Sequence, residues 1–143
     1  MKKSVPQISL ILLLLITIFA CDSKPKVPAD SFTVTGNVPG LETEYMSTSY
    51  VGPDGKRVSD SVFVENGKFS YTGKINKSSF VVFWPNDEKT IKRTGRGYYP
   101  AKSSQFAFLA SPGDYIEFKG DVTDFINAYP SGTPGNDDLA KIN

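Results

Sequence analysis

The sequence of 143 residues contains no histidine and only one cysteine. The absence of histidine excludes an imidazole general base, a Ser-His-Asp triad and a histidine-ligated metal site. One cysteine cannot form an internal disulfide, a Cys-x-x-Cys redox pair or a thiolate zinc site. An excess of charge is also lacking, because 16 Lys and Arg residues balance 15 Asp and Glu residues. We therefore expect no catalysis, no cofactor and no binding of nucleic acid.

Aromatic residues, glycine and proline are well represented, with 13% aromatics, 12 Gly and 10 Pro. This composition is typical of short strands joined by tight turns. The length suits one domain with a real core. We expect an all-β fold, an antiparallel β-sandwich or open barrel of six to eight short strands, after an N-terminal signal peptide.

The N-terminus has a positive start at Lys2 and Lys3, followed by an apolar run from Ile8 to Ala20. The run has the size of a signal-peptide core and is shorter than a membrane span of about 18–20 residues. A small residue directly before Cys21 resembles the lipobox of bacterial lipoproteins. The resemblance implies that residues 1–20 are removed and that acyl chains on Cys21 anchor the protein in a membrane of the cell envelope, inner or outer. The alternative is an ordinary secretory signal or a short anchor helix, with an incidental Cys21.

The mature chain divides into three parts by composition. Residues 21–30 are polar, carry two prolines and show no periodicity, which predicts a flexible tether. Residues 31–135 hold the strand patterns and form the expected β domain. Residues 136–143 predict the truncated start of a linker helix, with Asn136 as its N-cap.

Two hairpins are predicted from turn residues. Asn66-Gly67 suits the two positive-φ positions of a type I′ turn, so the segments on either side of it should pair. The Ser-Pro-Gly-Asp turn at 111–114 predicts a second hairpin between the strands at 106–109 and 115–119.

Three further strands are expected. Residues 44–51 are mostly polar and should expose one face, whereas residues 80–84 are apolar at every position and should be covered on both faces. Residues 125–128 are expected to form an edge strand. The side chains predicted to supply most of the core are Phe32, Val34, Val62, Val64, Phe69, Tyr71, Phe80, Val82, Trp84, Phe106, Phe108, Ile116 and Phe118.

Four segments follow one another along the chain in the order expected for one family: FTVTG at 32–36, DSVFVENGKFSYTG at 60–73, FLASPGDYIEFKGD at 108–121 and SGTPGNDDL at 131–139. Together they resemble the β-rich domain of unknown function that precedes lipid-anchored, thioredoxin-like thiol:disulfide oxidoreductases of the AhpC/TSA and TlpA type. The similarity covers about residues 31 to 140. Longer members of that group continue into a helical linker and a domain with Cys-x-x-Cys, so no catalytic residue carries over. The resemblance implies an accessory or binding module; the alternative is a truncated or split oxidoreductase.

The most concentrated basic and aromatic segment lies between residues 86 and 104. It predicts a loop that binds an anionic ligand or docks a partner, such as an envelope protein or a thioredoxin-like domain. The alternative is a solvated loop without a ligand. The candidate residues are Lys89, Lys92, Arg93, Arg96, Tyr98 and Tyr99.

A carboxylate-dependent, carbohydrate-active enzyme is the least favoured alternative. Such an enzyme needs two carboxylates that face each other at about 5–10 Å, usually from different elements. The sequence offers only the adjacent pairs Asp87-Glu88 and Asp137-Asp138. Trp84 is able to line a carbohydrate platform, but its apolar neighbours predict that it belongs to the core.

Overall fold

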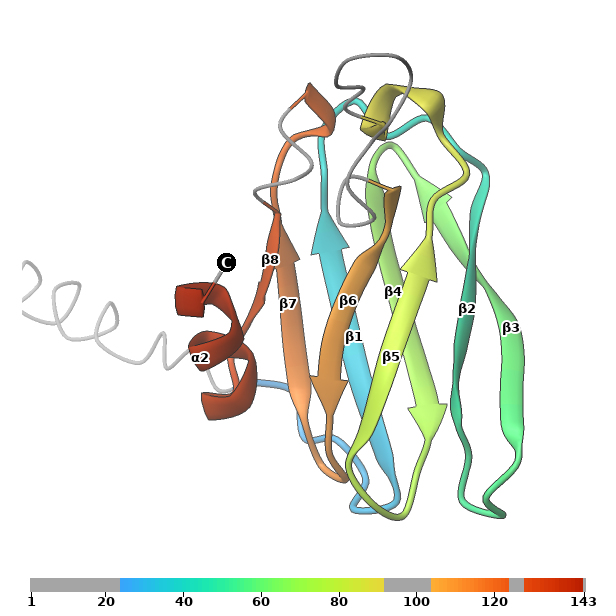
Figure 1. The fold of residues 1–143 in the computed structure, drawn as a ribbon, viewed down its shortest axis with the longest axis vertical. Helices are drawn as coiled ribbons and strands as arrows, with labels where there is room; N and C mark the ends of the chain where they lie inside the picture. The colour runs from blue at the N-terminus through green and yellow to red at the C-terminus, as the bar shows by residue number, and fades with distance from the viewer. Residues whose placement is uncertain (1–23, 92–103, 124–127, 143) are drawn as a thin grey trace, which may run out of the picture.

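The structure is a computed structural model that describes residues 24–91, 104–123 and 128–142. These ranges form an eight-stranded β sheet and confirm the all-β expectation (Figure 1). The strands are β1 (Ser31–Asn37), β2 (Tyr45–Val51), β3 (Arg57–Glu65), β4 (Lys68–Lys74), β5 (Ser79–Trp84), β6 (Phe106–Ala110), β7 (Tyr115–Lys119) and β8 (Tyr129–Ser131). A short 3-10 helix, η2 (Glu88–Thr90), follows β5, and the α-helix α2 (Pro134–Ile142) follows β8.

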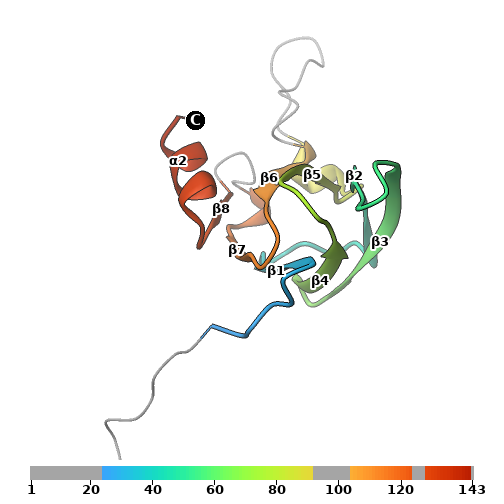
Figure 2. The same ribbon diagram turned by 90° about the horizontal axis from the view of Figure 1, so that it is seen from below.

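The strand order is β6-β5-β2-β3-β4-β1-β7-β8, and the sheet curls into a nearly closed barrel (Figure 2). Strand β3 joins the two halves of the sheet. It pairs with β2 over residues 57–63 and with β4 only where Val64 opposes Phe69 and Glu65 opposes Lys68. Beyond this short ladder β3 and β4 diverge, so the other part of β3 is an edge of the sheet.

The β3–β4 hairpin confirms the turn prediction. Asn66 and Gly67 both have positive φ, 52° and 74°, as a type I′ turn requires. Gly67 is also needed for space, because a Cβ there would lie 2.3 Å from the carbonyl oxygen of Val38. The backbone N–H of Val38 donates to the Gly67 carbonyl at 2.8 Å, which ties the turn to the end of β1.

The second predicted hairpin is wrong. Strand β6 pairs with β5, whereas β7 pairs in parallel with β1. The intervening turn is bound to β1: the Gly113 N–H donates to the Ser31 carbonyl at 2.7 Å, and the Thr33 N–H donates to the Asp114 carbonyl at 2.9 Å. β1 pairs with β4 on one side, and its other edge is free to pair with β7. The chain therefore crosses at this turn from the half of the sheet that contains β6 to the half that contains β1.

The burial of β5 also differs from the prediction, which had both faces of this strand buried. Val81 and Phe83 are fully buried, whereas Phe80 is 57% exposed. Val82 and Trp84 share the outer face with Phe80 and are half-buried. Assigning Phe80 to the core was therefore wrong, because a strand in the barrel wall has only one face toward the interior.

Aromatic rings fill the barrel interior. Phe83 and Phe108 pack edge to face with centroids 5.2 Å apart, and Phe106 and Phe118 do so at 4.3 Å. Of the predicted core residues, Val64 and Tyr71 pack against this cluster while only partly buried. The predicted residues that are buried are Phe32, Val34, Val62, Phe69, Phe106, Phe108, Ile116 and Phe118.

The two end strands, β6 and β8, border the seam of the barrel, and α2 follows β8 at this seam (Figure 1). Asn136 is fully buried and lies within the first turn of α2, so its assignment as the N-cap was wrong. Its side-chain oxygen accepts from the Leu109 N–H at 2.9 Å, and its amide nitrogen donates to the Leu109 carbonyl at 2.7 Å. Asn136 thus takes the place of a strand partner along the free edge of β6. The edge strand expected at 125–128 falls mostly on residues 124–127, which lie outside the described residues. The edge strand that the structure shows is β8, at residues 129–131.

Candidate functional site

Most of the residues predicted as a ligand loop lie outside the described residues. Lys92, Arg93, Arg96, Tyr98 and Tyr99 belong to this group, as does the predicted lipidation site Cys21. Lys89 is described: it lies in η2, and its ammonium group forms an ion pair with Glu42. The basic loop therefore stays a prediction, and its one described member is engaged within the domain.

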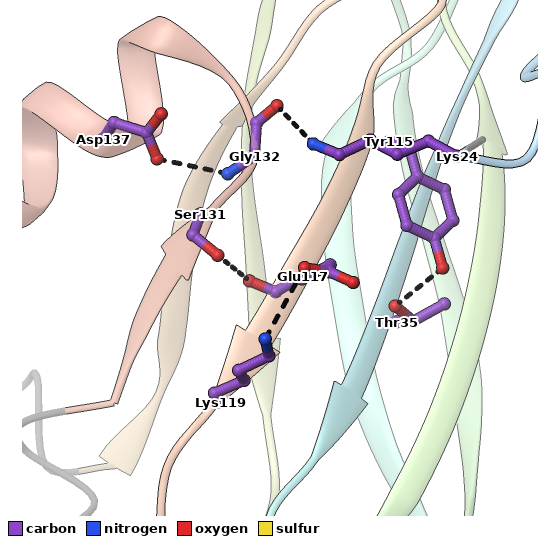
Figure 3. Close-up of polar contacts among 8 residues, drawn as sticks. All are labelled: Lys24, Thr35, Tyr115, Glu117, Lys119, Ser131, Gly132 and Asp137. Atoms are coloured by element: carbon purple, nitrogen blue, oxygen red, sulfur yellow. Dashed lines mark hydrogen bonds and ion pairs between the residues drawn. The ribbon is translucent and has the colours of Figure 1, made fainter. Parts of the chain in front are cut away.

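The adjacent carboxylates serve local structure. The two oxygens of Asp87 accept from the backbone N–H groups of Lys89 at 2.9 Å and Glu42 at 3.2 Å. Asp137 accepts from the Gly132 N–H at 3.1 Å (Figure 3), and Asp138 pairs with Lys141 at 2.8 Å. Among the described residues, no three Asp, Glu or Cys side chains gather closely enough to hold a metal ion.

Polar groups on the outer wall formed by β1, β7 and β8 contact one another (Figure 3). The Thr35 hydroxyl donates to the Tyr115 hydroxyl at 3.3 Å, and the Ser131 hydroxyl donates to the Glu117 carbonyl at 3.3 Å. Lys119 lies 3.8 Å from the Glu117 carboxylate. The polar groups of this wall are therefore engaged with one another.

The outer face of β2, β3 and β5 is different, because serines meet there beside the only tryptophan of the chain. Alternate residues of a strand point to the same face. The strand register places Ser47 between Ser61 and Trp84, and it places Ser49 beside Ser59. Four serines from two strands thus form a block next to one indole ring. The sheet holds them rigidly, since β2 is hydrogen-bonded on both sides.

These residues line an open groove. One depression, with a volume of about 430 Å³, is lined by the four serines, Trp84, Arg57, Asp60 and Thr48. A second, of about 340 Å³, is lined by Trp84 and by residues after β5, including Asn86 and Ser104. Both volumes fall within the usual range of ligand pockets, about 300–1,000 Å³. We call the two depressions together the Trp84 groove. Trp84 forms the wall that they share, so its assignment to the core was wrong.

Two hydroxyls at the serine end of the Trp84 groove have no hydrogen-bond partner among the described residues: Thr48 Oγ1 and Ser49 Oγ. Thr48 faces the interior and is 2% exposed, while Ser49 is on the outer face and is 8% exposed. A buried hydroxyl that lacks a partner costs about 1–3 kcal/mol. Ser47 differs, since its hydroxyl accepts from the Asn86 side chain at 3.4 Å.

A polar network contacts β3 at Asp60, in the part of the strand that is not paired with β4. The Asp60 carboxylate accepts from the Ser61 N–H at 2.7 Å and from the Tyr71 hydroxyl at 3.2 Å. The Tyr71 and Tyr50 hydroxyls are 3.4 Å apart. Burial, helped by Tyr50 and Asp60, raises the pKa of Tyr71 far above its ordinary value. Asp60 therefore fixes the serine-bearing strand and covers part of its free edge.

The fold and the groove define a small, nearly closed β barrel with a polar-aromatic surface on one wall. The chain belongs to the family described as a domain of unknown function (DUF4369), whose model matches residues 32–139. The match runs from β1 into α2 and includes every residue that lines the groove. It confirms the resemblance to a β-rich domain of unknown function, whereas the relation to thioredoxin-like oxidoreductases stays a prediction.

No curated protein and no solved structure matches this chain. Within the described ranges, no helix has the length and apolar character needed to cross a bilayer.

The sequence carried one signal for the Trp84 groove. Ser47 and Ser49 alternate with the buried residues of β2, which indicates a strand with one polar face. Ser59 and Ser61 flank Asp60, which is exposed as well, so the alternation is weaker in β3. The meeting of these faces beside Trp84 depends on the strand register, and the sequence does not reveal that register.

Proposed function

We propose that the protein is a membrane-anchored bacterial lipoprotein whose β domain is a non-catalytic binding module. The observation that carries the proposal is the Trp84 groove, in which serine hydroxyls and one indole ring lie on rigid strands. The charged side chains of Arg57 and Asp60 line the same depression as the serines, and those of Asp87 and Glu88 line the other. Binding surfaces commonly combine an apolar platform with a few fixed polar groups.

The chemistry of the groove supports binding over catalysis. A serine hydroxyl is a weak nucleophile unless a base activates it. The carboxylate nearest in sequence to these serines is that of Asp60, which already accepts hydrogen bonds from the Ser61 N–H and the Tyr71 hydroxyl. Arg57, which lines the groove as well, carries a guanidinium group, which has N–H donors and no acceptor.

The anchor is proposed from the apolar run before Cys21, and the start of the described chain limits how far Cys21 can lie from the barrel. The Lys24 ammonium donates to the Gly132 carbonyl at 3.2 Å, so residue 24 lies against the barrel wall (Figure 3). Three residues from Cys21 to Lys24 span at most about 11 Å in extended form. Lipid on Cys21 would therefore hold the barrel close to the membrane surface.

Lipidation is tested by Cys21→Ala in the full chain expressed in a bacterial host. We expect the wild type to fractionate with membranes and to incorporate an alkyne-labelled fatty acid. The variant should lose the label and either leave the membranes or keep an uncut signal. Lys24→Ala, which leaves the cysteine in place, is the matched control and should be labelled normally. A wild-type protein that takes up no label would contradict the anchor.

Binding is tested with a photo-crosslinking amino acid introduced in living cells at Ser59, in the groove. A second variant carries it at Thr72, which is exposed on the outer face of β4. We expect an adduct of defined mass from position 59 and none from position 72. The binding role of this face is refuted by the absence of any adduct at 59, or by equal adducts at both positions.

A further inference from the structure

Trp84 is the last residue of β5, and its side chain lies at the surface. Phe83 is fully buried in the core, and the alternation of β5 therefore turns Trp84 to the outer face. Trp84 is half-buried there and forms the wall between the two depressions. An indole in this position offers a flat apolar surface and one N–H donor. A matching ligand needs a flat apolar face of its own.

The hydroxyls beside the indole select for neutral polar groups. A serine hydroxyl both donates and accepts hydrogen bonds, so its best partner is a group that also does both. Ser47, Ser59 and Ser61 offer three such hydroxyls within one block, and Ser49 adds a fourth whose oxygen is buried. Arg57 is the only cationic side chain among the described residues that line this depression, so the depression is poorly suited to a highly charged anion. Ligands rich in hydroxyl groups fit this surface best.

An extended peptide fits less well. A peptide that adds to a sheet needs free backbone N–H and C=O groups along an edge. Strand β2 has partners on both sides, and the Ser61 N–H on the open side of β3 is already bonded to the Asp60 carboxylate. The groove therefore offers side-chain hydroxyls, and the backbone edge beside it is partly occupied by the Asp60 carboxylate.

Building on the proposed binding function, we infer that the Trp84 groove binds a saccharide chain. One pyranose ring stacks its C–H face on the Trp84 indole, and the hydroxyls at the ring edge hydrogen-bond with the serine block. The depression on each side of Trp84 holds the sugar unit before or after the stacked ring. Ser49 gains the partner that it lacks when its hydroxyl rotates about the Cα–Cβ bond toward the groove.

The test uses the full-length lipoprotein in a detergent without a sugar headgroup. Trp84 is the only tryptophan, so its fluorescence reports on the groove directly. Cellohexaose, maltohexaose, chitohexaose and mannohexaose are titrated separately. We expect at least one of them to shift the emission in a saturable way. No change with any of the four overturns the inference.

Variants then locate the site by calorimetry with the saccharide that binds. Ser47→Ala combined with Ser61→Ala should weaken binding by about tenfold, and Trp84→Ala should weaken it at least as much. Phe80→Ala is the matched control, because Phe80 is an exposed aromatic on the same face of β5 and outside the groove. It should bind as the wild type does. Circular dichroism and thermal midpoints verify the fold of each variant.

Equal affinity of the wild type and the Trp84→Ala variant overturns the inference. The crosslinking experiment separates this failure from failure of the proposed function. A protein adduct at position 59 with no saccharide binding refutes the saccharide and keeps the binding module. The absence of any adduct at position 59 refutes the binding module itself.

Discussion

Replacing Asn136 by alanine should be among the most destabilising changes in a polar residue of this domain. The side chain is fully buried and bridges α2 to the free edge of β6. It makes two hydrogen bonds with the Leu109 backbone, and its amide nitrogen also donates to the Thr133 hydroxyl at 2.8 Å. The substitution removes all three bonds and leaves the Leu109 N–H and C=O without their partner.

The expected loss follows from these three bonds. Each contributes about 0.5–1.5 kcal/mol net, and an orphaned buried group costs about 1–3 kcal/mol. Leu109 is 38% exposed, so water can replace part of what its backbone loses. We therefore expect a loss of about 2–3 kcal/mol in the free energy of unfolding, a large share of the stability of a small domain. With a urea m-value of about 1–3 kcal/mol/M, the unfolding midpoint should fall by about 0.7–3 M.

Equilibrium unfolding in urea, followed by the fluorescence of Trp84, measures this loss. Asp138→Ala is the matched control, since Asp138 lies in the same helix, is exposed and forms only one surface ion pair. It should cost at most about 0.5 kcal/mol. A loss below about 1 kcal/mol for Asn136→Ala, or one equal to the control, would refute the bridging role.

Asn136→Asp gives an independent check through pH. Burial raises the pKa of the new carboxyl above its unfolded value of about 4. A group with a raised folded pKa contributes its stability in full below the unfolded pKa and loses it as the pH rises through the folded pKa. The difference in stability from the wild type should therefore be smaller at about pH 4 than at pH 7. A difference that is independent of pH would contradict the burial of this side chain.

Two further predictions concern β5 and the tyrosine network. Phe83→Ala should lower the free energy of unfolding by about 3–5 kcal/mol, and Phe80→Ala, on the outer face of the same strand, by less than about 1 kcal/mol; similar losses in urea unfolding would contradict the assigned faces. The raised pKa of Tyr71 means that stability is complete below an unfolded pKa of about 10 and declines as the pH rises further. Tyr71→Phe should flatten this decline in thermal unfolding between about pH 9 and 11, and identical slopes in both proteins would refute it.

The local features of the fold could be predicted because few residues determine them. A type I′ turn needs positive φ at two adjacent positions, and Asn66-Gly67 supplies both. The predicted burial of Phe32 and Val34, which alternate with threonines in β1, is likewise confirmed. Each of these features is specified within a span of five residues.

Partner choice could not be predicted in the same way. The turn at 111–114 exists, and its Asp114 N–H donates to the Ser111 carbonyl at 3.0 Å. A turn of this kind does not determine which strand the next segment pairs with. That outcome depended on the open edge of β1, far away in the sequence. For the same reason the serine block beside Trp84 became visible only when the register of β2, β3 and β5 was known.

The β5 segment shows a third limit. Residues 80–84 are apolar throughout, so no polar position marks the outer face. The exposure of Phe80 follows from the place of β5 in the barrel wall, and Trp84 shares that outer face. A pattern without alternation carries no information about which side faces the interior.

The place of β1 in the sheet has a consequence for how the chain folds. β1 lies between β4 and β7, and its parallel ladder joins Thr33 to Tyr115, 82 positions later. Parallel pairing over such a separation requires closure of a long loop before any of its hydrogen bonds form, and topologies of this kind fold slowly, on the scale of about milliseconds to seconds. Until β7 arrives, β1 is paired on one side only, with its other edge open to strands of other chains. A growing chain therefore remains vulnerable to aggregation until residues 115–119 become available.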